Sequence, residues 1–209
     1  MRQALKRLII TATSRWPVRT LICWRVKTHL AQLAITFDDG PHPTFTPKVL
    51  DILASHGVKA TFFVLGREAE RYPHLLERTV ADGHEVGLHG YDHTHLDLPG
   101  QMNRTLSIVR GLGADSRTLR PPGGRLSGEI IAWSLQHQMS ILMWSFDLRD
   151  SLRHEGKASS RQPFESLTAG DIVLAHDDNP VCVAELPELI NVARRRGLTT
   201  VRVSELARG

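Results

Sequence analysis

Short apolar runs alternate with amphipathic segments along most of this chain, from residue 33 onward. The apolar runs have the length and composition of buried strands, and they span residues 33–38, 61–65, 84–88, 117–120, 140–145, 171–175 and 199–203. The segments between them predict helices over residues 46–57, 68–81, 127–137 and 184–196. Since strands that alternate with helices usually pair in parallel, the pattern predicts an α/β fold with about seven parallel strands.

The chain is long enough for one domain with a substantial core. It has 209 residues, of which 41% are hydrophobic, and no repeat or linker interrupts the pattern after residue 33. We therefore expect one domain over residues 33–209, preceded by a leader over residues 1–32. The two cysteines, Cys23 and Cys182, form no spacing motif, and we expect them to be buried apolar residues.

The leader is strongly basic. Residues 1–37 carry seven Lys or Arg and no acidic residue, while the whole chain has a net charge of +4. The apolar stretch at residues 8–10 is short and arginines follow it, so neither a signal peptide nor a membrane span is predicted. Two interpretations remain: a helix that packs under the domain, or a segment that lies on an anionic membrane surface. We expect a protein in the cytoplasm or at the inner face of the membrane, with export as the alternative.

Two adjacent carboxylates follow the first predicted strand. Asp38 and Asp39 come after the apolar run Leu33–Ile35, and Gly40-Pro41 then turns the chain. Adjacent residues of a strand point to opposite sides, so we expect the two carboxylates to divide their roles. One can hold a cation while the other stays free for proton transfer.

A histidine pair supplies further metal-ligand chemistry. His89 and His93 are four residues apart, and on one face of a helical turn both imidazoles could reach one ion. With one aspartate they form a set of two histidines and one carboxylate, which suits both catalytic zinc and non-haem iron. No phosphate-binding glycine motif is present, so no nucleotide or nucleic-acid partner is predicted.

Five motifs occur in a fixed order at the ends of predicted strands. They are TFDDGP (36–41), HGYDH (89–93), RPPGG (120–124), DLRDS (147–151) and LAHD (174–177). With these motifs, residues 33–206 resemble the polysaccharide deacetylases of carbohydrate esterase family four, also called the NodB-homology domain. The resemblance implies a distorted (β/α) barrel with seven strands. In such barrels ligands bind at the carboxyl ends of the strands, where these motifs fall.

The resemblance also implies a role for each site residue. Members of this family use a divalent metal, most often zinc, with cobalt or another ion possible. The implied roles are Asp38 as general base, His176 as general acid, Asp39, His89 and His93 as metal ligands, Arg120 and Asp150 as residues that orient Asp38 and His176, and Leu174 as an apolar wall for the acetyl methyl group.

Three positions depart from the family pattern. Gly90 stands where Thr or Ser is usual beside the first histidine. Gly123 replaces an aromatic residue, although its backbone N–H, the oxyanion donor of the family, remains. Ser151 stands where a tryptophan is usual. We therefore expect Gly123 and Ser151 to contact the substrate in a wider or differently lined groove.

The pattern as a whole predicts a metal-dependent hydrolase. We expect it to remove the N-acetyl group from N-acetylglucosamine-type units of an oligo- or polysaccharide and to release acetate. A catalytically impaired member that only binds glycans is the second hypothesis. A non-haem iron oxygenase is the third, because that chemistry explains neither His176 nor Arg120.

Overall fold

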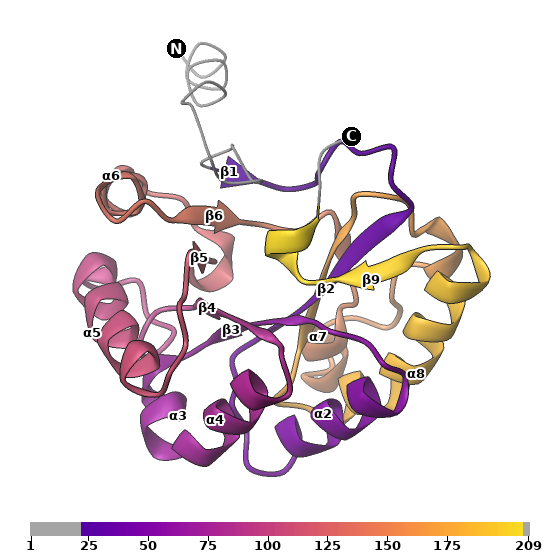
Figure 1. Ribbon diagram of the computed structural model, residues 1–209, viewed down its shortest axis with the longest axis horizontal. Coiled ribbons are helices and arrows are strands. Elements are labelled where there is room, and N and C mark those ends of the chain that lie inside the picture. Colours follow the sequence, from indigo (N-terminus) through magenta and orange to yellow (C-terminus); the bar gives the residue numbers. More distant parts are fainter. Residues whose placement is uncertain (1–21, 207–209) are drawn as a thin grey trace.

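Parallel strands form the centre of the molecule in the computed structural model, which describes residues 22–206. The sheet order is β1-β6-β5-β4-β3-β2-β8-β7, with β9 beside β2, and every pair of strands is parallel (Figure 1). The strands are β1 (Ile22–Cys23), β2 (Gln32–Asp38), β3 (Thr61–Val64), β4 (Glu85–Leu88), β5 (Thr118–Leu119), β6 (Ser140–Leu142), β7 (Phe146–Asp147), β8 (Ile172–His176) and β9 (Thr199–Val201). This is a distorted (β/α) barrel, and among residues 22–206 its path of paired strands does not close.

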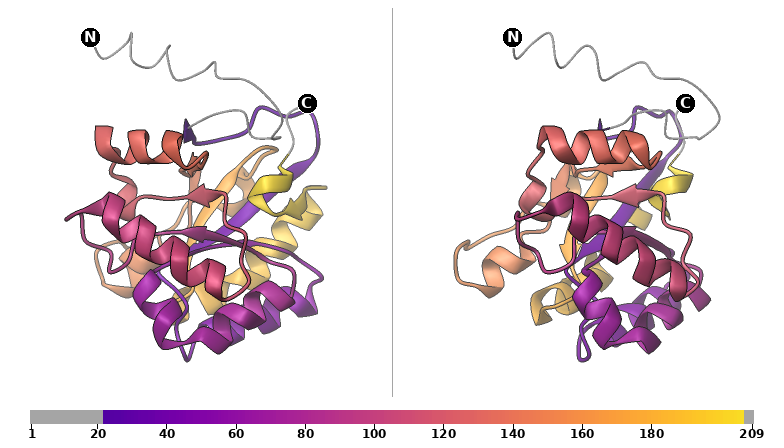
Figure 2. Two further views of the ribbon diagram at one scale, coloured as in Figure 1. Left: turned by 60° about the vertical axis from the view of Figure 1, so that its left-hand side comes forward. Right: turned by 90° about the vertical axis from the view of Figure 1, so that its left-hand side faces the viewer.

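Helices surround these strands, as two further views also show (Figure 2). They are α2 (Thr46–Ser55), α3 (Gly66–Arg71), α4 (Pro73–Ala81), α5 (Leu98–Gly111), α6 (Gly128–Gln136), α7 (Asp150–His154) and α8 (Pro180–Arg195). Three short 3-10 helices are η1 (Pro122–Gly124), η2 (Phe164–Ser166) and η3 (Val203–Glu205). Ser127 caps α6 as predicted, because its hydroxyl accepts from the Ile130 N–H at 3.2 Å.

All seven predicted strands have a counterpart in the sheet. The prediction missed the short strands β1 and β7. The single helix predicted over residues 68–81 is wrong: α3 ends at Arg71 and α4 begins at Pro73. The intervening Tyr72 has φ −127° and ψ 57°, because the residue before a proline is disfavoured in the helical region.

Alternate residues of β2 point to opposite sides of the barrel wall. Leu33, Ile35 and Phe37 are buried in the core between the strands and the helices. Ala34 belongs to a second core inside the barrel, and the next interior positions are Thr36 and Asp38. The barrel interior therefore changes from apolar to polar toward the carboxyl end of β2.

The described part of the basic leader belongs to the barrel. In residues 22–32 the structure has strand β1, parallel to β6, where we expected a helix. Arg25 Nε lies 3.5 Å from Asp171 Oδ1, and Val26 N donates to Gly170 O at 2.9 Å. The proposed membrane-binding segment otherwise falls in residues 1–21, outside the described residues. Within residues 22–206, no helix has the length and apolar character needed to cross a membrane.

Candidate active site

Asp38 is the last residue of strand β2 and Asp39 follows it, and both carboxylates reach the same imidazole. His89 Nε2 lies 3.7 Å from Asp38 Oδ2 and 3.5 Å from Asp39 Oδ1. The prediction that the two side chains point to opposite sides is therefore wrong. Asp39 has φ 73°, so its backbone leaves the extended conformation and turns its side chain back toward that of Asp38. The two acidic groups belong to a single site.

The two predicted metal-binding histidines lie in a loop. Residues 89–93 follow β4, and His93 has φ 65°, so the expected helical turn does not form. The imidazoles still converge, with ring centroids 5.2 Å apart and His93 Nε2 3.5 Å from Asp39 Oδ1. One donor atom from each of Asp39, His89 and His93 lies within 4.8 Å of the others. The three predicted ligands are thus brought together by backbone shape instead of helical spacing.

This donor set fits a divalent cation. The Arg120 carbonyl can only accept, so His89 Nδ1 donates to it at 2.8 Å and His89 Nε2 presents a lone pair to the site. Asp39 Oδ1 is buried and has no hydrogen-bond partner among the described residues. Burial raises the pKa of Asp39 and lowers those of His89 and His93, which favours neutral imidazoles. An ion bound here would satisfy the lone carboxylate oxygen.

Helix α5, which the sequence pattern did not predict, supports the histidine loop. Gln101 Oε1 accepts from the Tyr91 N–H at 2.8 Å, and Thr105 Oγ1 donates to the Gly90 carbonyl at 2.9 Å. At Gly90, φ is 84° and an added Cβ would lie 3.2 Å from both Gln101 Oε1 and Pro122 Cγ. The glycine that departs from the family pattern therefore fits this particular loop, because a side chain there would be strained and crowded.

Arg120 holds Asp38 from inside the barrel. Its Nη1 lies 2.7 Å from Asp38 Oδ1 and 2.9 Å from Thr36 Oγ1. The Leu142 and Met143 carbonyls accept from the other guanidinium nitrogens, both at 2.9 Å. Arg120 is fully buried and Asp38 is 3% exposed. The guanidinium therefore neutralises the carboxylate and fixes its position.

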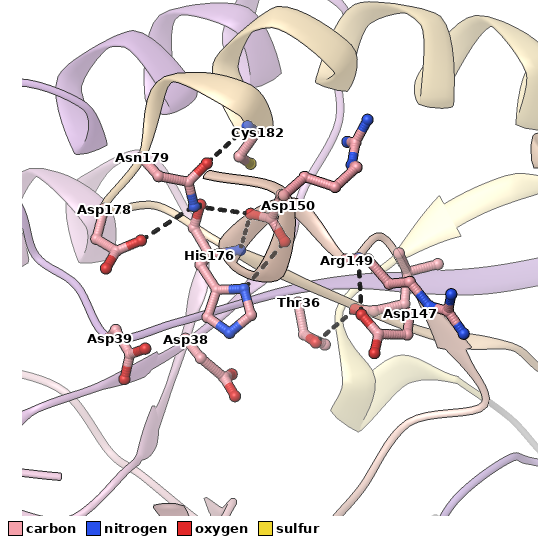
Figure 3. Close-up of polar contacts among 12 residues, drawn as sticks. Thr36, Asp38, Asp39, Asp147, Arg149, Asp150, His176, Asp178, Asn179 and Cys182 are labelled. Atoms are coloured by element: carbon pink, nitrogen blue, oxygen red, sulfur yellow. Dashed lines mark hydrogen bonds and ion pairs between the residues drawn. The ribbon is translucent and has the colours of Figure 1, made fainter. Parts of the chain in front are cut away.

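His176 lies opposite Asp38, because these two residues are paired in the register of β2 and β8. Its Nδ1 is 3.0 Å from Asp150 Oδ1, and its backbone N donates to Asp150 Oδ2 at 2.9 Å. Figure 3 shows the ring between Asp150 and the Asp38–Asp39 pair. Burial by itself lowers the pKa of His176, but its hydrogen bond and charge interaction with Asp150, together with Asp38 and Asp39, raise that pKa to about 10. The imidazole is thus kept protonated.

Asn179 supports the His176–Asp150 pair, and the sequence analysis did not identify this residue. Its Nδ2 donates to Asp150 Oδ2 at 3.0 Å, and its Oδ1 accepts from the Cys182 N–H at 3.0 Å. The side chain is therefore the N-cap of α8 as well as a support for Asp150 (Figure 3). An asparagine before a proline at residue 180 was the available signal, and it would have moved the predicted start of this helix from 184 to 180.

The three remaining predicted residues lie around this centre. Leu174 is two residues before His176 on β8, so it shares the same face, and it is buried. Gly123 is exposed in η1, with φ 56°. Ser151 is half-buried at the second position of α7. These placements bring all ten predicted site residues to the carboxyl end of the barrel.

Rings that were not predicted stand beside the glycines of η1. His95 Cε1 lies 3.9 Å from the point where a Cβ on Gly123 would be. Trp144 Cη2 lies 2.8 Å from the corresponding point on Gly124, and its ring centroid is 5.7 Å from Arg120 Cζ. Rings from two other loops therefore lie next to the segment that has no aromatic residue at position 123.

Comparisons with known proteins agree on one family. Residues 25–142 match the family described as Polysaccharide deacetylase. The chain is 31% identical over 198 residues to a peptidoglycan-N-acetylglucosamine deacetylase of Bacillus cereus, covering 90% of this chain and 93% of that protein. It is 38% identical over 164 residues to a chitooligosaccharide deacetylase of Sinorhizobium fredii, covering 75% of this chain and 76% of that protein.

A solved structure has the same fold. It is a peptidoglycan N-acetylglucosamine deacetylase crystallised with 4-naphthalen-1-yl-N-oxidanyl-benzamide. The two structures superpose with a TM-score of 0.76 at 28% sequence identity, and the match covers 90% of this chain and 92% of the other.

Proposed function

Because this chain belongs to the polysaccharide deacetylase family, we propose that it removes N-acetyl groups from N-acetylglucosamine-type units of an oligo- or polysaccharide and releases acetate. One observation carries the proposal most directly. Asp38 and His176 are register partners on β2 and β8, and the three metal-ligand side chains lie at the same strand ends. A general base and a general acid therefore face one cation site, as amide hydrolysis requires.

Asp39, His89 and His93 would hold the metal, with zinc proposed first and cobalt or another divalent ion as alternatives. Such an ion acts as a Lewis acid on a carbonyl oxygen and lowers the pKa of a bound water. Three protein ligands of this kind would leave room for water and substrate on a bound ion.

The protein groups divide the proton transfers. Asp38 accepts a proton from the attacking water while Arg120 holds its carboxylate in place. The water oxygen forms a bond to the acetyl carbon, and the Gly123 N–H donates to the developing oxyanion. His176 gives its proton to the leaving nitrogen as the carbon–nitrogen bond breaks, and Asp150 keeps His176 in the protonated form. Leu174 packs against the acetyl methyl group.

Each alternative leaves observed contacts unexplained. An iron oxygenase uses the two histidines and one carboxylate, but it needs neither the Arg120–Asp38 pair nor the His176–Asp150 pair. A protein that only bound glycans would need no buried base opposite a protonated imidazole. We therefore propose an active hydrolase over both.

Acetate release tests the proposal. The zinc-loaded protein is assayed on N-acetylglucosamine oligomers, peptidoglycan and an exopolysaccharide. We expect Asp38→Asn and His176→Ala each to lose about 10²–10⁴-fold in rate while metal content is retained. Asp115→Asn and His74→Ala are matched controls on the exposed surface, and they should keep the parental rate.

Two results would contradict this function. Near-parental turnover in either variant would remove that residue from the mechanism. Substrate oxidation by the metal-free protein reloaded with Fe(II) and 2-oxoglutarate, without acetate release, would favour the oxygenase.

We also propose the cytoplasm or the inner face of the membrane as the location. This prediction rests on the basic leader, of which residues 1–21 lie outside the described residues. Cell fractionation of the full chain with N-terminal sequencing tests it, and recovery of a shortened protein outside the cytoplasm would contradict it.

A further inference from the structure

An open pocket of about 370 Å³ adjoins the metal-binding residues. Asp39, His93 and Asp178 line it at the metal end, and Arg67, Arg71 and Tyr72 of the α3 segment also line it. Its volume is within the range of small-ligand sites. None of the roles proposed above uses the three residues from the α3 segment.

Helix α3 begins beside the two loops that carry the metal-binding residues. Its N-cap and its first residue bond to both metal-site loops, since Leu65 N donates to Gly40 O at 3.0 Å and Gly66 N donates to Gly90 O at 3.0 Å. From Gly66 to Arg71 the helix rises by about 8 Å, at roughly 1.5 Å per residue. Arg71 and Tyr72 therefore stand about 8 Å along the helix from the end that bonds to the metal-site loops, and they line the same pocket as Asp39 and His93.

The charges along the pocket leave one cation unpaired. Arg67 Nε is 2.9 Å from Glu68 Oε1, so this pair is neutral. Asp39 belongs to the metal set, and Asp178 lies near it at the same end (Figure 3). Within residues 22–206, Arg71 forms no ion pair with a carboxylate.

Arg71 is also placed to recognise a planar anion beside a sugar face. Its Cζ lies 5.3 Å from the centroid of the Tyr72 ring, and the side chain is exposed. A guanidinium offers a fork of N–H donors that matches a carboxylate, and a half-buried aromatic ring offers an apolar surface with a polar tip. A neutral glycan would use the ring but leave the cation without a partner.

We propose that the Arg71–Tyr72 end of this pocket binds a carboxylate on the sugar unit next to the one that is deacetylated. The inference rests on the proposed function and assigns the residue that would favour a glycan with an acidic sugar beside N-acetylglucosamine over a neutral one. Arg71 is a specificity-determining residue in this scheme, and it takes no part in proton transfer.

Three tetrasaccharides test the charge directly. One alternates N-acetylglucosamine with a sugar that carries a lactyl ether carboxylate. The second is the same compound with each carboxylate converted to a methyl amide, and the third is the neutral N-acetylglucosamine tetramer. We expect Arg71→Ala to raise KM for the acidic compound about five-fold, with kcat and both neutral substrates unchanged. Arg71→Lys should restore part of the loss, and the effect should shrink as salt screens the pair.

The control for surface charge is Arg195→Ala, on α8, whose side chain is 62% exposed. It should leave all three substrates unaffected. An equal effect of Arg71→Ala on the acid and its amide, or no effect on either, would overturn the carboxylate site. A glycan fragment whose acidic groups lie only on an attached peptide tests whether the carboxylate that Arg71 binds belongs to the sugar. If Arg71 favours that fragment alone, the carboxylate lies on the peptide and the sugar assignment is wrong.

Calorimetry measures the affinity of the parent and of Arg71→Ala for the same acid and amide. This measurement tests the carboxylate site separately from the proposed deacetylase activity, because it needs no turnover. Charge-selective binding without acetate release would overturn only the proposed function. Acetate release without charge-selective binding would overturn only this inference.

Discussion

Replacing Arg120 by methionine should break the buried ion pair of the active site. The substitution removes the guanidinium that lies 2.7 Å from Asp38 Oδ1 and leaves that carboxylate in the barrel interior. The two side chains are 0% and 4% exposed, so water cannot take the place of the lost cation. The Leu142 and Met143 carbonyls also lose a donor.

The expected cost follows from this burial. Removing one partner of a buried pair costs about 3–5 kcal/mol, because the other charge is left unpaired. The free energy of unfolding of a domain is only about 5–15 kcal/mol, so Arg120→Met should lose a large fraction of it. The double variant Asp38→Asn, Arg120→Met removes the unpaired charge, and we expect it to be about 3 kcal/mol more stable than the single variant.

Urea titration at pH 7 measures the free energy of unfolding of both variants, and their acetate release is assayed in parallel. Stability should return in the double variant while activity stays lost, because the base is absent. The exposed pair Arg117–Asp115, with side chains 42% and 71% exposed, is the matched control. Arg117→Met should cost less than about 1 kcal/mol. A double variant no more stable than Arg120→Met would refute the reasoning, since the unpaired charge would then not be the cause.

Three further predictions concern other parts of the structure. Burial lowers the pKa of His84 from 6.5 to about 4, so between these values the unfolded chain binds a proton that the folded protein does not. From pH 7 to pH 5 the parent should therefore lose about 2 kcal/mol more unfolding free energy than His84→Asn in urea titrations. Gly40→Ala should lower the melting temperature and acetate release, because its Cβ would overlap the Asp177 carboxylate. Elemental analysis should find one divalent metal per parent chain and none in a His89→Gln, His93→Gln variant; full metal content there would disprove the ligand assignment.

Several features could be predicted because they depend on local pattern and on the rules of parallel sheets. The run before Asp38 predicted β2, and the period of the apolar residues predicted the other major strands. Parallel strands place their carboxyl ends at one face, so residues as distant in sequence as Asp38, His89 and His176 could be expected to meet there.

The geometry within the site depended on contacts between distant segments. The spacing of His89 and His93 is compatible with both a helix and a loop, and only the φ of 65° at His93 and the bonds from α5 establish the loop. The left-handed backbone at Asp39 likewise turns both carboxylates into one site. Each conformation is rare for an isolated residue and forms where surrounding structure outweighs its local cost.

The site residues outside the motifs could be identified only from the tertiary structure. Asn179 reaches Asp150 across 29 positions, and Arg71 adjoins the metal site only because α3 bonds to two separate loops. A period of 2 or 3.6 records which face of an element is buried. It carries no information about which polar group from another element lies opposite, because that is decided when the strands pair and the helices pack around them.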